Sequence, residues 1–266
     1  MSRNLKIAGS LAVAAIAAKV WAARRQPAGP SAYLPIDKPK PVAEGIWIVD
    51  GAPIHAMGLT MPVRMTVIRL GNGSLLLHSP IRHSPALAQA ITELGPISHM
   101  VAPTTAHWQF MAGWQQAFPQ AVTWAVPGLR DRAQVKKSGL RLDRDLGETA
   151  PPEWSGTIRQ GLVRGLGLAE AWLLHEPSRT LVLTDLVENL EPARLPPVTA
   201  LAARLVRGNV GRPALHVRAA LLAGGEQARS DIRTMVELAP DKVVFAHGAW
   251  FATDGAARLR DAFAWV

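Results

Sequence analysis

Short apolar runs recur from Pro41 to the end of the chain, and turn residues separate them. Two pairs of runs predict β-hairpins, residues 65–70 with 74–78 and residues 168–174 with 180–184, because each pair encloses a short turn segment. Further strands are expected at 46–49, 97–101, 122–126 and 242–246, and helices at 84–94, 107–118, 197–207, 226–238 and 256–265. Hairpins followed by strand–helix alternation favour two packed sheets with helices outside over a doubly wound sheet.

The composition allows a large core and excludes several kinds of site. Hydrophobic residues make up 48% of the 266 residues, enough to bury the core of one large α/β domain. There is no cysteine, which excludes disulfides, a cysteine nucleophile, iron–sulfur clusters and cysteine-based zinc knuckles, so metal ligands must come from the eight histidines and the carboxylates. The Gly-x-Ser-x-Gly, Gly-Lys-Ser/Thr and Gly-x-Gly-x-x-Gly motifs are absent, which argues against the common serine hydrolases, P-loop NTPases and dinucleotide enzymes.

The first 25 residues form a separate hydrophobic unit. Residues 7–23 are apolar apart from Ser10 and Lys19, and as one helix they would span about 25 Å, close to the hydrocarbon thickness of a bilayer. Arg24 and Arg25 follow directly, and a basic flank on this side disfavours export. We therefore expect residues 1–25 to be an uncleaved transmembrane helix that anchors the chain, with its folded domain in the cytoplasm.

Two alternatives compete for this segment. One is a signal peptide that is cleaved after export, and the other is a peripheral amphipathic helix. In each case the proline-rich residues 26–41 are expected to be a linker, and residues 42–266 the folded domain.

The chain is basic, but the placement of its charge argues against nucleic-acid binding. The net charge is +9, and residues 1–25 carry five basic residues and no acid. A nucleic-acid footprint would instead lie on the folded domain. A second basic stretch, residues 192–225, contains five arginines and no acidic residue. We expect that stretch to be a solvated or membrane-facing helical surface, and we expect no nucleic-acid partner.

Four polar residues stand just beyond apolar strand runs. They are His78, His107, Asp185 and His247. Each one alone would be explained as a helix cap or as a residue that fixes a loop. Because strand ends converge at one edge of layered folds, the four together predict a common site.

Five short motifs follow one another along the chain: Glu44-Gly45-Ile46-Trp47, His78-Ser79-Pro80, Ser178-Arg179-Thr180-Leu181, Thr184-Asp185 and His247-Gly248. The order of these motifs resembles that of the metallo-β-lactamase superfamily. Their residues are similar to those of an uncharacterised branch of this superfamily, whose domain has no assigned function. The resemblance implies an α/β fold, an αββα four-layer sandwich, over residues 42–266.

The metal loop of this superfamily reads His-x-His-x-Asp-His and aligns with residues 105–113. Thr105 then takes the position of the first His, and His107 takes that of the second. Gln109 replaces the Asp, and Phe110 replaces the last His. One signature residue of four is therefore retained, and the resemblance implies a degenerate metal-binding motif.

The resemblance also implies the roles of the ligands that remain. His107 would serve one metal, His247 the other and Asp185 both, and neither site is complete. A single zinc or other divalent ion could still be held by these three residues, and the alternative is that no metal binds. His78 and Glu170 are candidates for a fourth ligand. Spacing across the second hairpin places Ala169 or Glu170 opposite Asp185, and Glu170 would be there either as an oxygen ligand or as a solvated residue at the rim.

Two hypotheses about function follow. The first is a membrane-anchored protein with an eroded metal site, non-catalytic or weakly active, which binds a small molecule or a partner in a cleft lined by Thr105, Trp108, Gln109 and Phe110. The second is a single-metal hydrolase of an ester, amide or phosphoester that uses His107, Asp185 and His247. The missing signature residues favour the first slightly, and the sequence leaves open whether the chain is an enzyme.

Overall fold

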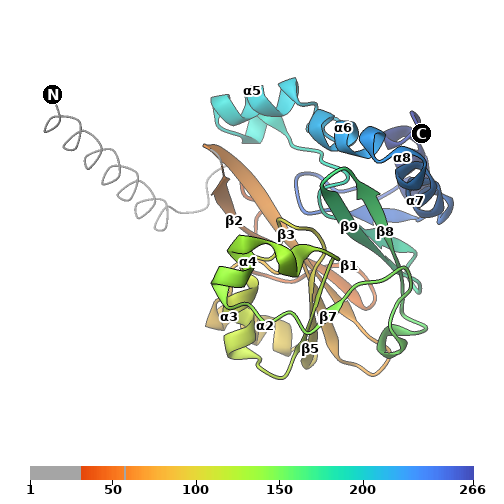
Figure 1. Cartoon of the computed structure of the whole chain (residues 1–266). Helices are drawn as coiled ribbons and strands as arrows, with labels where there is room; N and C mark the ends of the chain where they lie inside the picture. The colour runs from red at the N-terminus through yellow and green to blue at the C-terminus, as the bar shows by residue number, and fades with distance from the viewer. Residues whose placement is uncertain (1–30, 57) are drawn as a thin grey trace, which may run out of the picture.

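The computed structural model describes residues 31–56 and 58–266, which form two β-sheets packed together with helices on their outer sides (Figure 1). The larger sheet has seven strands that neighbour one another in chain order: β1 (Lys40–Ala43), β2 (Ile46–Ala56), β3 (Leu59–Arg69), β4 (Leu75–His78), β5 (Ile97–Ala102), β6 (Val122–Ala125) and β7 (Arg144–Asp145). The smaller sheet has the order β11-β10-β9-β8 and contains β8 (Ile158–Gly165), β9 (Leu168–His175), β10 (Thr180–Val182) and β11 (Lys242–Val244). The prediction of two packed sheets with helices outside is confirmed.

Seven α-helices lie in the described part of the chain: α2 (Pro85–Thr92), α3 (Met111–Ala117), α4 (Ala133–Ser138), α5 (Pro197–Leu205), α6 (Leu215–Ala223), α7 (Gly225–Glu237) and α8 (Gly255–Ala262). Leu87 of α2 and Trp114 of α3 belong to the core of the larger sheet. Ile232 of α7 and Leu259 of α8 belong to the core beneath the smaller sheet. Three 3-10 turns complete the helical elements: η1 (Leu129–Asp131), η2 (Pro152–Trp154) and η3 (Pro192–Arg194).

The side chains of β9 show how the layers are held together. Ala171 and Leu173 point into the core shared with the larger sheet, whereas Trp172 and Leu174 point into the core under α6, α7 and α8. All four are buried. Successive side chains of a strand lie on opposite faces, so an unbroken apolar run is typical of a strand covered on both sides. The apolar runs in the sequence therefore encode the inner layers of the sandwich.

Local sequence signals set the first turn of the larger sheet and the start of α2. β3 pairs antiparallel with β4 around Gly71-Asn72-Gly73, which confirms the first predicted hairpin. Ser84 caps α2, because its hydroxyl accepts the N–H of Leu87 (3.2 Å) and Pro85 follows at the first helical position.

The helix predicted at 107–118 is shorter than expected and begins at Met111. Thr104 is the reason, because its Oγ1 accepts the backbone N–H groups of Ala106 and His107 (3.2 Å each) and so holds the preceding segment in a turn. This turn carries His107 away from the helix and toward the smaller sheet.

β8 and α6 are not predicted from the sequence. Two glycines interrupt the apolar pattern of β8, and the packing of the fold requires both. A Cβ at Gly161 would overlap the indole of Trp172 on the neighbouring strand. A Cβ at Gly165 would lie 2.7 Å from the carbonyl oxygen of Ala220 in α6. Gly161 leaves room for the Trp172 indole over β8, and Gly165 lets the backbone of α6 approach the same strand closely.

The residues expected in a linker lie partly on the domain. Ser31 and Ala32 are buried, and the Ser31 hydroxyl donates a hydrogen bond to the carbonyl of Arg194 (2.8 Å). The transmembrane helix expected in residues 1–25 lies outside the described residues. Within residues 31–56 and 58–266, no helix combines the length and the apolar character that crossing a bilayer requires.

Candidate metal centre

Three of the four strand-end residues meet where the two sheets adjoin. His107 follows β5 of the larger sheet, Asp185 follows β10, and His247 follows β11. An isolated bridge between Thr104 and Glu170 joins the two sheets at this edge. The parallel pairing of β10 with β11 brings Asp185 and His247 to the same end of the smaller sheet.

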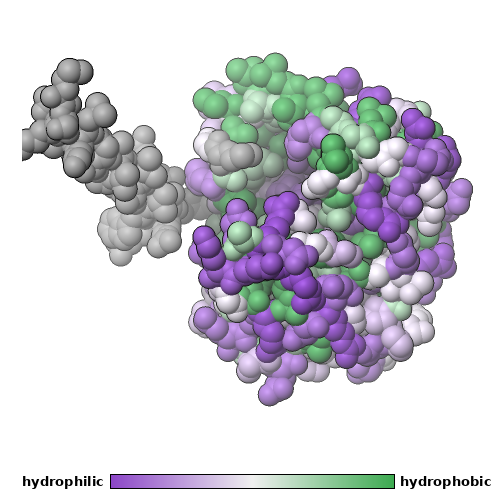
Figure 2. All heavy atoms as spheres, viewed as in Figure 1, coloured by the Kyte–Doolittle hydropathy of each residue, from purple (hydrophilic) through white to green (hydrophobic). Residues whose placement is uncertain are grey.

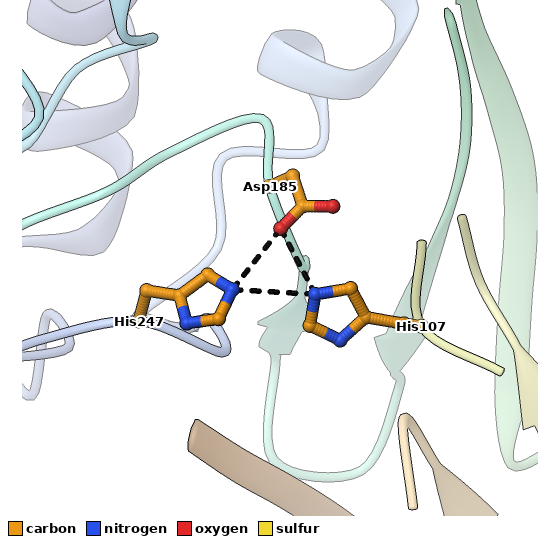
Figure 3. Close-up of side chains that lie close together, drawn as sticks. All are labelled: His107, Asp185 and His247. Carbon is orange, nitrogen blue, oxygen red and sulfur yellow. Dashed lines mark hydrogen bonds and ion pairs between the residues drawn. The ribbon is translucent and has the colours of Figure 1, made fainter. Parts of the chain in front are cut away.

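The side chains of these residues point at one another (Figure 3). His107 Nε2 lies 3.1 Å from Asp185 Oδ1, and His247 Nε2 lies 3.3 Å from the same oxygen. The two Nε2 atoms are 3.2 Å apart. Ligand atoms bound at 2.0–2.2 Å to one ion lie roughly 3.0–3.6 Å from each other, so a single cation fits among these three atoms.

Hydrogen bonds fix which nitrogen of each imidazole faces the cluster. His247 Nδ1 donates to the carbonyl oxygen of Pro62 (2.7 Å), and His107 Nδ1 shares a hydrogen bond with the hydroxyl of Ser79 (2.7 Å). Because the Pro62 carbonyl can only accept, the Nδ1 of His247 carries a proton. Its Nε2 then turns toward the Nε2 of His107 and a carboxylate oxygen. Three groups rich in electron pairs converge here, and a positive charge, a proton or a metal ion, is needed among them.

The pKa directions agree with this need for positive charge. Burial raises the pKa of Asp185, but the charges and hydrogen bonds of His107 and His247 lower it more, so that it lies well below its ordinary value. Burial lowers the pKa of His247, but the hydrogen bond and charge of Asp185 outweigh it and raise the pKa to about 9. The metal-free cluster is therefore a carboxylate that stabilises a protonated imidazole.

Asp185 is oriented by groups around it. Thr104 Oγ1 donates to Asp185 Oδ2 (3.1 Å), which leaves Oδ1 for the two imidazoles. Glu170 lies behind the loop that carries Asp185. Its carboxylate accepts the backbone N–H groups of Thr184 (2.6 Å), Asp185 (2.7 Å) and Leu186 (2.9 Å). These bonds fix the backbone from which the Asp185 side chain projects.

Glu170 is therefore neither a rim residue nor a member of the cluster. Of the two residues predicted opposite Asp185, it is Glu170 that lies there, because Leu173 pairs with Val182 and this pairing extends to Glu170 and Asp185. The side chain is only 1% exposed, and both of its oxygens bind backbone. Burial and the charge of Asp185 raise the pKa of Glu170 to about 8, against the three N–H donors that lower it.

The other candidate for a fourth ligand, His78, is buried beside the cluster but outside it. Burial and the charge of His107 lower its pKa to about 3, so it is neutral. Ser79, the next residue, provides the hydroxyl that orients His107. His175 is the last residue of β9, where its Nδ1 shares a hydrogen bond with the hydroxyl of Ser178 (2.7 Å).

The Gly that follows His247 is also explained by packing. Gly248 has a φ of +94°, and a Cβ at this position would overlap the carbonyl of Asn189. The carbonyl of Gly248 accepts a hydrogen bond from the buried Arg64 (2.8 Å), and Arg64 forms an ion pair with Asp50 (2.7 Å). The His-Gly motif thus presents His247 from a turn that only glycine fits.

The cluster lines a largely apolar cavity of about 450 Å³. The β2–β3 hairpin and α5 supply most of its apolar wall: Ile54, Leu59, Met61, Val63, Ala202, Ala203 and Val206. Gln109 and Phe110 line it, as expected from the sequence, whereas the expected residues Thr105 and Trp108 are not among its lining residues. Trp108 instead packs against the core of the larger sheet.

Sequence reasoning missed Glu188, which lines the same cavity and is 8% exposed. No described residue donates a hydrogen bond to its carboxyl group. Burial raises the pKa of Glu188 to about 7, with a smaller effect from the charge of Asp185 and an opposing one from His247. The signal in the sequence is one acidic residue within the apolar run Leu186-Val187-Glu188-Asn189-Leu190.

Comparison with solved structures identifies the fold. The metallo-β-lactamase from Pontibacter korlensis is 13% identical, with a TM-score of 0.54 over 85% of this chain and 97% of that chain. The metallo-β-lactamase FIM-1 from Pseudomonas aeruginosa, in a mono-zinc form, is 15% identical, with a TM-score of 0.52 over 88% of this chain and 94% of that chain. The chain has the metallo-β-lactamase fold. A further enzyme of this kind, from Hirschia baltica, is 13% identical, with a TM-score of 0.52 and coverages of 85% and 95%.

Sequence comparison adds a family without an assigned function. The family model described as Domain of unknown function (DUF4336) matches residues 43–130. No curated protein sequence matches the chain. The predicted resemblance to an uncharacterised branch with the metallo-β-lactamase fold is confirmed.

Proposed function

We propose that this chain binds one divalent cation through His107, Asp185 and His247, and that it hydrolyses an ester, amide or phosphoester attached to an apolar group. The observation that carries the proposal is the convergence of the three ligand atoms within 3.1–3.3 Å. Each side chain is held in place by a partner that is not a ligand, as in preorganised metal sites.

The donor set suits zinc or a similar ion, since two imidazoles and a carboxylate leave a coordination position open for water or substrate. When bound, such an ion supplies a Lewis acid that polarises a carbonyl or phosphoryl oxygen and acidifies water. The mono-zinc form of FIM-1 supports a single-ion site in this fold.

The loop aspartate of the superfamily is missing here, so another residue must accept the proton of the attacking water. Gln109 occupies that position and its amide cannot accept a proton at neutral pH. Glu188 faces the same cavity with a carboxyl group that lacks a hydrogen-bond donor among the described residues, and its pKa of about 7 suits a general base. We assign to Glu188 Oε the proton that leaves the attacking water.

The cavity indicates the substrate class. Aliphatic side chains from the β2–β3 hairpin and α5 form most of its wall. Apolar walls exclude water and hold an apolar substituent next to the polar cluster. We therefore expect substrates with an acyl or alkyl group beside the bond that is cleaved.

A second candidate function is ligand binding without turnover. Phe110, which lines the cavity at the position of a lost ligand, favours it. In this case the cavity would bind an apolar small molecule, and the chain would show no metal-dependent hydrolysis.

The test compares zinc-loaded and chelator-treated full chain on a small set of probes. These are p-nitrophenyl butyrate, p-nitrophenyl decanoate, bis-p-nitrophenyl phosphate and a chromogenic cephalosporin, which is a β-lactam and is included because the neighbouring structure is a metallo-β-lactamase. Our proposal predicts zinc-dependent turnover that falls at least 100-fold in Asp185→Ala. The exposed His55→Ala serves as the matched control and should keep full activity.

Two outcomes would contradict the proposal. Turnover that is unchanged by chelation or by Asp185→Ala would place the chemistry elsewhere. Stoichiometric zinc without turnover of any probe, together with saturable binding of the decanoate ester, would favour the binding function instead.

A further inference from the structure

A second apolar surface lies on the outer side of α5 and α6. Eight large hydrophobic side chains are exposed in the described chain, and six of them lie between residues 198 and 222. We call these six the α5–α6 face: Val198, Leu201, Leu205, Val210, Leu215 and Leu222, which are 44–70% exposed. Figure 2 shows hydrophobic residues gathered over α5. Patches of this kind are rare on soluble monomers and mark a surface that contacts something apolar.

The helix α5 is apolar on two sides. Its inner side, with Ala202, Ala203 and Val206 nearby, lines the cavity. Its outer side carries Leu201 and Leu205, which are 57% and 67% exposed. A helix that is apolar on both sides and packed on one leaves the other available for a second apolar medium.

The charge around the α5–α6 face is positive. Residues 192–225 contain five arginines and no acid. Arg212 pairs with Asp261, and Arg218 lies over the ring of Trp265. Arg204 and Arg207 are exposed next to the leucines. Basic side chains beside exposed leucines are typical of surfaces that bind anionic lipids.

The start of the described domain lies beside α5. The Ser31 hydroxyl donates a hydrogen bond to the carbonyl of Arg194, which ends η3 just before α5. In the sequence, the apolar residues 7–23 precede Ser31 by only seven residues, 24–30. The chain therefore enters the described domain next to η3 and α5.

We propose that the α5–α6 face docks on an anionic lipid bilayer, with Leu201 and Leu205 among the acyl chains and Arg204 and Arg207 at the headgroups. The proposal needs neither a bound metal nor hydrolysis, so it stands or falls independently of the proposed function. It predicts that docking would hold the wall of the cavity next to the membrane.

The absence of cysteine makes a site-specific test possible. Full chain carrying Leu201→Cys is labelled with an environment-sensitive fluorophore and mixed with vesicles of phosphatidylcholine and phosphatidylserine that contain brominated acyl chains. Lys137→Cys, exposed on α4, is the matched control. We expect at least threefold stronger quenching at position 201 than at position 137.

Charge reversal tests the second part of the docking surface. Arg204→Glu with Arg207→Glu should reduce the quenching at position 201 by half or more and lower vesicle affinity about fivefold per lost arginine. The same change at Arg132 and Lys137 should have little effect, since both are exposed on the side of α4.

Each other outcome overturns the proposal. Failure of the chain to float with vesicles, or equal quenching at the two positions, excludes docking through this face. A lipid-free blue shift at position 201 that is independent of protein concentration, without quenching by vesicles, means that residues 7–23 cover the face. A blue shift that grows with protein concentration without lipid means that a second copy covers it.

Discussion

At the scale of residues, Glu170 acts on the site through the backbone. Its buried carboxylate accepts three N–H groups from the loop of Asp185, and it does so from a position that the sequence alone assigns to a ligand or to the rim. Glu170→Gln replaces one acceptor oxygen by a donor that faces N–H groups. We expect the free energy of unfolding to fall by about 2–4 kcal/mol, measured by urea denaturation, and zinc affinity to fall with it.

The matched control is Glu148→Gln. Glu148 pairs with Arg164 at the surface, where its side chain is 59% exposed, and its loss should change the free energy of unfolding by less than about 1 kcal/mol. Equal effects of the two substitutions would mean that the three backbone hydrogen bonds of Glu170 do not hold the loop.

Glu188 gives a second prediction, about pH. Its pKa is about 7 in the folded chain and near 4.5 when unfolded, so the folded state binds more protons between these values. Stability of the metal-free chain should therefore fall as pH rises from about 4.5 to 7, and this contribution, roughly 1–3 kcal/mol, should vanish in Glu188→Gln. Urea denaturation across this pH range measures the difference. A stability profile that is identical in both proteins would show that Glu188 is not desolvated.

At the scale of elements, the glycines of β8 are a packing requirement. Gly161→Ala places a Cβ against the indole of Trp172, and we expect it to lower the free energy of unfolding by about 1–3 kcal/mol. Gly147→Ala is the control, because nothing lies within 4 Å of a Cβ there. An unchanged free energy of unfolding in Gly161→Ala would mean that the Trp172 side chain can shift to make room for the added Cβ.

The same element shows what can be predicted from sequence. The hairpins β3–β4 and β9–β10 are predicted correctly, because local turn residues separate their strands: Gly71-Asn72-Gly73 in the first and Glu176-Pro177-Ser178-Arg179 in the second. β8 is missed because Gly161 and Gly165 serve contacts with residues distant in sequence. Helix α3 is predicted too long for a local reason, because the hydroxyl of Thr104 accepts the N–H groups of Ala106 and His107 and holds this segment in a turn.

The residues of the site also divide into those that can be predicted from the sequence and those that cannot. His107, Asp185 and His247 are predictable because strand ends converge, and the structure brings all three together. The roles of Glu170 and Glu188 depend on which backbone and which cavity their side chains reach, and the residue pattern does not encode either. Trp108 illustrates the reverse case, a residue expected in the pocket that packs on the core.

At the scale of the whole molecule, two sheets each contribute part of one cluster. The larger sheet supplies His107, and the smaller supplies Asp185 and His247, so the cluster exists only when the sheets are packed. A bound cation should therefore stabilise the complete fold, by about 2.7 kcal/mol at a concentration 100 times its dissociation constant. The central claim is that these distant segments form one preorganised cation site.

The most direct test is elemental analysis of full chain purified without chelators and then titrated with zinc in a calorimeter. Our account predicts one divalent ion per chain, its loss in Asp185→Ala and in His247→Ala, and its retention in the His55→Ala control. A chain that binds no ion, or one that keeps its ion after both Asp185→Ala and His247→Ala, would contradict it.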